Sequence, residues 1–200
     1  MLSEALMAAS LLIAAYQDLK RREVEDRVWI PAAIGIALAL IFGNQLFFTL
    51  VKLGFVALIV VVATWYGTLG QADLIAFVVV GADPAPLSLT LTLGAAAVAL
   101  AAHIGYLYRK GQIGRSLEIP VSQFEKEWKW IPKAVISAGV RTEVGRDVNE
   151  AREEALAKAV EGSTVEVKYG VPTVAYLGLG YFAFLVYALI SNFQFFLTFP

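Results

Sequence analysis

Two aspartates carry the clearest potential for chemistry in this chain, because each borders a long apolar run. Asp18 follows "AAYQ" and Asp73 precedes "LIAFVVV", whereas the other acidic residues fall in loops, tails or one polar stretch. A charged side chain within a bilayer costs roughly 2.5–3.5 kcal/mol on insertion scales, so such residues usually have a function. Two carboxyl groups held close together can share one proton: the charged one draws a proton from water, and the neutral one protonates an amide carbonyl oxygen. The pair therefore has the chemistry needed to hydrolyse a peptide bond.

The composition indicates that the elements positioning these aspartates are membrane helices. Of the 200 residues, 58% are hydrophobic and 16% are charged, and the mean hydropathy is +0.68, which places the chain among membrane proteins. A net charge of −1 argues against a nucleic-acid partner. The absence of cysteine excludes disulfides, thiolate metal sites and a catalytic thiol.

Six apolar segments are predicted to cross the lipid bilayer as helices: residues 2–16, 28–42, 46–66, 68–82, 87–108 and 171–190. The first has no basic residues before it, so we expect it to remain as a span rather than to be cleaved as a signal peptide. All lysines and arginines except Lys52 fall within residues 20–27 and 109–168. The positive-inside rule assigns both regions to the cytoplasm. The prediction is a multi-pass plasma-membrane protein with its N-terminus outside and both aspartates near the cytoplasmic face.

The predicted fold is a polytopic α-helical membrane protein with a small cytoplasmic α+β domain. Three parts are expected: membrane helices one to five in residues 1–108, the α+β domain in 109–169, and the sixth helix with an aromatic tail in 170–200. Within the domain, β-branched content predicts strands at residues 116–124, 133–140 and 163–170. A helix is predicted over residues 147–160, with Asp147 as its N-cap and Arg152 exposed to water.

Glycine next to the second aspartate suggests space for an extended substrate. Gly70 lies three residues before Asp73, and without a Cβ atom it would let another backbone approach the carboxylate or let the chain turn sharply. The glycines of "YLGLGY" near the C-terminus are expected to allow close packing between helices instead.

Both aspartates lie in motifs that resemble those of one family. "GQAD", from Gly70 to Asp73, is similar to the GxGD signature of polytopic aspartic proteases, with the small apolar Ala72 in the third position. "DLKRREVED", which begins at Asp18, is similar to the other half of the signature in prepilin peptidases, where an aliphatic residue follows six positions later, here Val24. Together the motifs resemble those of the archaeal preflagellin/prepilin peptidases, also called class III signal peptidases.

This resemblance implies a specific activity. Such enzymes use two aspartates, here Asp18 and Asp73, to remove the short basic leader of archaellin or type IV pilin-like precursors at the cytoplasmic face. The precursor keeps its hydrophobic N-terminal helix in the membrane. Bacterial relatives often add a cysteine-containing zinc region and a methyltransferase activity, and this chain has no cysteine. The resemblance therefore implies a peptidase without metal or cofactor.

Several residues keep two interpretations open. Glu23, Glu25 and Asp26 could form a solvated loop, or they could attract a basic leader peptide through their charge. His103 is the only histidine, and a lone histidine in an apolar helix is more often structural than a metal ligand. An alternative function from another class is a small proton- or cation-coupled transporter that uses the two aspartates. Inverted repeats would favour a transporter, and none is evident in the sequence.

Overall fold

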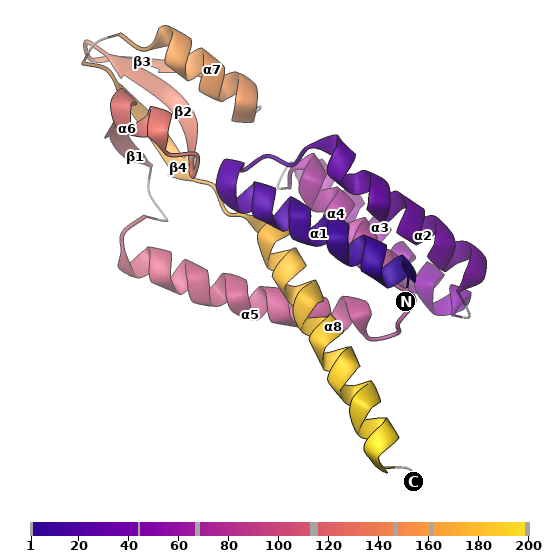
Figure 1. Cartoon of the computed structure of the whole chain (residues 1–200). Helices are drawn as coiled ribbons and strands as arrows, with labels where there is room; N and C mark the ends of the chain where they lie inside the picture. Colours follow the sequence, from indigo (N-terminus) through magenta and orange to yellow (C-terminus); the bar gives the residue numbers. More distant parts are fainter. Residues whose placement is uncertain are drawn as a thin grey trace. The chain divides into compact units, whose positions relative to one another are not determined.

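The computed structural model describes residues 2–43, 45–66, 69–112, 116–145, 148–160 and 162–198. The chain divides into two compact units. The helical unit comprises residues 1–19, 23–101 and 172–200, and the sheet unit comprises residues 20–22 and 102–171. Figure 1 labels the elements of both units along the chain.

The helical unit is built from the six apolar segments that the sequence predicts. Their helices are α1 (Leu2–Arg21), α2 (Ile30–Phe42), α3 (Leu46–Tyr66), α4 (Gln71–Ala82), α5 (Ser88–Arg109), whose last turns belong to the sheet unit, and α8 (Thr173–Thr198). A short 3₁₀ helix, η1 (Asp26–Trp29), leads into α2. The helix of the first apolar segment continues past residue 16 to Arg21, so Asp18 lies within α1.

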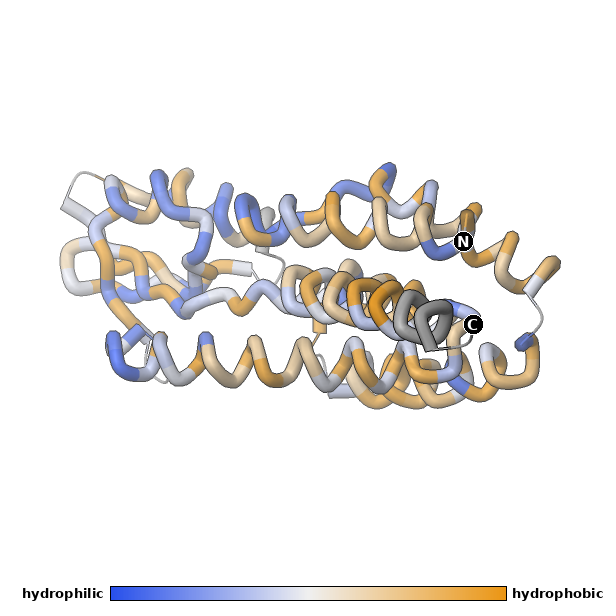
Figure 2. The backbone as a smooth tube through the Cα atoms, turned by 60° about the horizontal axis from the view of Figure 1, so that its bottom comes forward, coloured by the Kyte–Doolittle hydropathy of each residue, from blue (hydrophilic) through white to orange (hydrophobic). Residues whose placement is uncertain are grey.

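Three of these helices have the length and composition of membrane spans: α3, α5 and residues Thr173–Ser191 of α8. Among the described residues, α4 is apolar but shorter. The outer faces of the long helices carry large exposed apolar side chains, such as Phe47 and Val61 on α3. Such faces suit lipid, where apolar surface is not exposed to water. Figure 2 shows how apolar residues predominate along these helices. Six spans and their orientation remain predictions.

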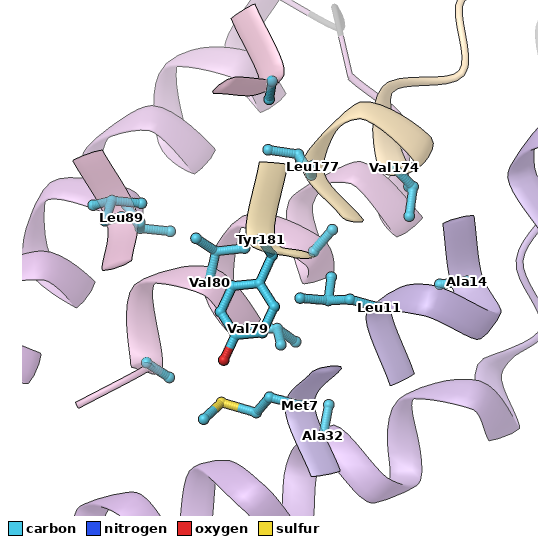
Figure 3. Close-up of a cluster of buried hydrophobic side chains, with 14 of the residues drawn as sticks. Met7, Leu11, Ala14, Ala32, Val79, Val80, Leu89, Val174, Leu177 and Tyr181 are labelled. Atoms are coloured by element: carbon cyan, nitrogen blue, oxygen red, sulfur yellow. The ribbon is translucent and has the colours of Figure 1, made fainter. Parts of the chain in front are cut away.

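The core of the helical unit lies where α1, α4 and α8 meet. Met7 and Leu11 of α1, Val79 and Val80 of α4, and Tyr181 of α8 are almost fully buried in one cluster. Figure 3 shows the ring of Tyr181 among these side chains. Because the cluster joins three helices far apart in the sequence, it fixes their mutual positions.

Close helix packing at the glycines of α8 confirms the expectation from "YLGLGY". A Cβ atom added at Gly178 would lie 2.8 Å from the Cβ of Ala15 and 3.0 Å from the carbonyl oxygen of Leu11, both on α1. One added at Gly180 would meet backbone atoms of Thr92 and Ala96 on α5. Since atoms cannot approach so closely, only glycine permits α8 to lie against both helices at these distances.

The sheet unit is a four-stranded antiparallel sheet with two helices. Its elements are β1 (Leu117–Pro120), α6 (Val121–Lys126), β2 (Trp130–Ser137), β3 (Val140–Glu143), α7 (Val148–Lys158) and β4 (Thr164–Tyr169), and the strand order is β1-β4-β2-β3. Ala155 of α7 and Val165 of β4 are fully buried, so α7 covers one face of the sheet. The predicted helix over 147–160 and the strands over 133–140 and 163–170 correspond to α7, β2 and β4. The Asp147 N-cap lies outside the described residues.

Two predictions for this unit are wrong. The strand expected over residues 116–124 ends at Pro120, because the chain turns into α6 and buries Phe124 in the core. Arg152 was expected in water, yet only 6% of it is exposed. Its Nη2 donates hydrogen bonds to the carbonyl oxygens of Phe124 (2.8 Å) and Glu125 (2.9 Å) near the end of α6. The side chain thereby adds donors to carbonyl groups in the last turn of that helix, where the backbone supplies few.

Candidate active site

Asp18 is buried and accepts a hydrogen bond from α8, a helix that lies far from it in the sequence. Only 8% of the residue is exposed, and its Oδ2 accepts a hydrogen bond of 3.0 Å from the backbone N–H of Ala175 in α8. The first ladder bond of α8 runs from the N–H of Tyr176 to the carbonyl oxygen of Pro172 (3.4 Å). Ala175 therefore lies among the first residues of the helix, whose N–H groups have no acceptor in the ladder. The Asp18 carboxylate caps α8 from another element.

Asp73 lies in the first turn of α4, as the sequence predicts. Its Oδ2 accepts a hydrogen bond of 3.0 Å from the N–H of Gly70, which occupies the N-cap position. The carbonyl oxygen of Gly70 in turn accepts from the N–H of Leu74 (3.2 Å). The Asp73 carboxyl group thus lies at the positive end of the α4 dipole.

Asp18 and Asp73 both lie in the helical unit, and electrostatic repulsion from Asp18 acts on the Asp73 carboxyl group. Each comes from a different helix, and each carboxylate accepts a backbone N–H at the start of a helix. Two carboxyl groups in this relation favour a state in which one is charged and the other protonated. Asp18 and Asp73 are therefore the candidate pair for the acid–base chemistry expected from the sequence.

Gly70 and Ala72, the two motif residues next to Asp73, have ordinary backbone angles and packing contacts. Gly70 has extended backbone angles, φ −75° and ψ 164°, and a Cβ atom there would meet only the Asp73 Oδ2, at an ordinary 3.6 Å. The described residues show neither a sharp turn nor a close backbone contact at Gly70. Its expected part in leaving room for an extended substrate stays a prediction. Ala72 is half-buried and packs against the core of the helical unit.

The acidic loop after α1 is exposed at all three predicted positions, Glu23, Glu25 and Asp26. The chain reverses at Arg22, whose φ is 58°. The backbone N–H of Glu25 then donates to the side-chain oxygen of Gln17 (3.0 Å), which holds the loop against α1. Val24 between these residues is half-buried and packs on the core. The loop is anchored by Val24 while its carboxylates face water.

His103 contributes to packing in the sheet unit, where its ring contacts those of Tyr106 and Tyr169, with centroids 6.4 Å and 6.0 Å away. Arg22 donates a hydrogen bond to the hydroxyl of Tyr169 (3.3 Å). In the part of the chain that the structure describes, no cluster of three or more histidine, aspartate or glutamate side chains could hold a metal ion.

A buried polar network that sequence reasoning missed joins four elements of the helical unit. Lys52 of α3 donates from Nζ to the carbonyl oxygens of Asp83 and Ala85 (2.6 Å to Ala85) and to the Oγ of Ser88 (2.9 Å). Asp83, at the C-terminal end of α4, is fully buried and accepts from the hydroxyl of Tyr181 (2.5 Å). A single lysine inside an apolar helix was the available signal, because such a residue needs buried partners.

The fold and these carboxylates together define a helical membrane protein with a candidate acid–base pair. Residues 5–106 match the type IV leader peptidase family, and the chain belongs to that family. The matched segment includes both aspartates. No curated protein and no solved structure matched the chain. Membership confirms the resemblance to prepilin and preflagellin peptidases and makes the protein a protease that processes leader peptides. It gives no support to the transporter alternative.

Proposed function

We propose that the protein is an aspartic endopeptidase in which Asp18 and Asp73 form the catalytic dyad. The observation that carries this proposal is the placement of the two carboxyl groups: they belong to separate helices of one compact unit, and each accepts a backbone N–H at the start of a helix. Burial of Asp18 and its contact with the start of α8 support a role beyond ending a helix. Within a family of leader peptidases, these are the two carboxyl groups that lie in the family-like motifs, and their placement at the starts of helices supports the proposal.

In the proposed reaction, the ionised member of the pair removes a proton from a water molecule. The resulting hydroxide attacks the scissile amide carbon while the protonated member donates its proton to the carbonyl oxygen. Collapse of the tetrahedral intermediate breaks the C–N bond and passes a proton to the leaving amine. The backbone N–H groups of Ala175 and Gly70 hold the two carboxyl groups in place during these steps. No metal ion is needed, so a chelator should not inhibit.

The proposed substrates are archaellin or type IV pilin-like precursors with a short basic leader and a hydrophobic N-terminal helix. The precursor helix would stay in the bilayer, and the leader would reach the dyad at the cytoplasmic face. The loop that follows α1, a few residues after Asp18, exposes three acidic residues: Glu23, Glu25 and Asp26. They are proposed to attract the lysines and arginines of the leader.

The test is leader cleavage by purified protein in detergent or lipid. Asp18→Asn and Asp73→Asn should each reduce cleavage of a precursor to background while the proteins remain folded. Glu118→Gln, an exposed position on β1, provides a matched control that removes one carboxylate elsewhere and should cleave normally. Substantial cleavage by either aspartate variant would remove that residue from the mechanism.

A further inference from the structure

The donor that holds Asp18 does not come from its own helix. The N–H of Ala175 belongs to α8, 157 residues further along the chain, and reaches the Asp18 Oδ2 at 3.0 Å. This N–H precedes the first backbone hydrogen bond within α8. It can therefore donate to the carboxylate without breaking a hydrogen bond of the helix. A backbone donor of this kind has a fixed direction, so it restricts the orientation of the carboxylate that it binds.

A second contact fixes the axial position of α8 relative to α1. Gly178, one turn after Ala175, packs against Ala15, one turn before Asp18, and against the carbonyl of Leu11. The helices therefore run antiparallel, with their small residues in contact next to the hydrogen bond. Sliding or rotation of α8 would have to break the Gly178 packing and the Ala175 hydrogen bond together.

The bond also favours charge on Asp18. A hydrogen bond from N–H to an ionised carboxylate is shorter and stronger than a neutral one, and the start of a helix carries a partial positive charge. At 8% exposure, few water molecules can replace this donor. Loss of the N–H would leave the carboxylate less well oriented and its charge less well compensated.

We propose that the first turn of α8 is the positioning element for Asp18, with the backbone N–H of Ala175 as the group that orients its carboxylate for catalysis. The inference rests on the proposed role of Asp18. Ala175 is a positioning residue, because it acts through the aspartate and not on the substrate. On this inference α8, which carries neither aspartate motif, contributes to the reaction by orienting Asp18.

The test removes the N–H and keeps the helix. Ala175→Pro deletes the donor, and proline is tolerated in the first turn of a helix. Two controls separate the donor from other effects: Ala175→Val keeps the N–H and adds similar bulk, and Thr173→Pro adds proline at the first helical position, which favours it. The expected result for Ala175→Pro is a kcat for leader cleavage lower by about 10²-fold. Its KM should stay within about twofold of the original, and both controls should stay close to the original protein.

Gly178→Ala is the second variant, and it keeps the inference testable if Ala175→Pro does not fold. The added methyl group should push α8 away from α1 and lower kcat, whereas Gly94→Ala, where nothing lies within 4 Å of the added atom, should not. A normal kcat in a folded Ala175→Pro, an equal loss in Ala175→Val, or a normal kcat in Gly178→Ala would each overturn the inference. If Asp18→Asn is inactive but Ala175→Pro is fully active, only this inference fails. If Asp18→Asn remains active, the proposed dyad fails first.

Discussion

The hydroxyl of Tyr181 donates a hydrogen bond of 2.5 Å to the fully buried carboxylate of Asp83. This contact joins α8 to the C-terminal end of α4, the helix that begins next to Asp73. Six residues earlier, α8 binds Asp18 on α1 through Ala175. One helix therefore contacts both helices that carry the proposed catalytic carboxyl groups, and its position relates one carboxyl group to the other.

Tyr181→Phe should destabilise the protein without changing its shape. The variant keeps the ring in the core and removes the hydroxyl that donates to Asp83. Loss of a hydrogen bond to a buried charged group costs about 1.5–3 kcal/mol of unfolding free energy. Thermal unfolding in detergent measures the change. Tyr187→Phe on the exposed side of α8 is the control, and equal unfolding temperatures for the two variants would contradict the account.

Lys52→Met should destabilise the protein more than the same change at an exposed lysine. The Nζ of Lys52 satisfies two carbonyl groups and the Ser88 hydroxyl near the start of α5. Ala85 and Ser88 keep the hydrogen bond between them, whereas the carbonyl group of Asp83 loses its lysine partner. A buried polar group left without a partner costs about 1–3 kcal/mol, so a loss of about that size is expected. Lys20→Met serves for comparison, since Lys20 is exposed. Unfolding of Lys52→Met at the same denaturant concentration as Lys20→Met would show that the network is unimportant.

Gly70→Ala should leave the stability of the protein almost unchanged, within about 0.5 kcal/mol. The backbone angles at Gly70 suit any residue, and the added methyl group meets only an ordinary contact with Asp73. Gly178→Ala, with a contact at 2.8 Å, should unfold at a clearly lower temperature. The two variants compared by thermal unfolding separate glycine needed for packing from glycine that the fold does not need. A large destabilisation by Gly70→Ala would contradict the geometry.

Neutralising the acidic loop should weaken binding of basic leaders only. With Glu23→Gln, Glu25→Gln and Asp26→Asn combined, the KM for a lysine- and arginine-rich leader should rise severalfold, because long-range attraction is lost. The KM for a neutral leader should not change. Added salt should reduce the difference, since exposed charges are screened within about 10 Å at 0.1 M ionic strength. An equal change in KM for the basic and the neutral leader would show that the loop does not bind the leader through its charge.

The sequence predicts those parts of the fold that depend on local pattern. Apolar runs place the helices, and the GQAD motif places Asp73 at the start of α4, because residue type alone carries this information. The Ala175–Asp18 contact could not be predicted in this way, since its donor is a backbone group that every residue except proline possesses. The burial of Arg152 was not predicted for a related reason: a charged residue can be buried when carbonyl groups from another element converge on it.

The central claim, that Asp18 and Asp73 act as one catalytic unit, is tested most directly by leader cleavage with both single variants and the double variant. When two residues act as a unit, removing either one abolishes catalysis and removing the second has no further effect. The account therefore predicts the same background rate for Asp18→Asn, Asp73→Asn and the double variant. A single variant that keeps a measurable rate, which the second substitution then lowers further, would contradict it.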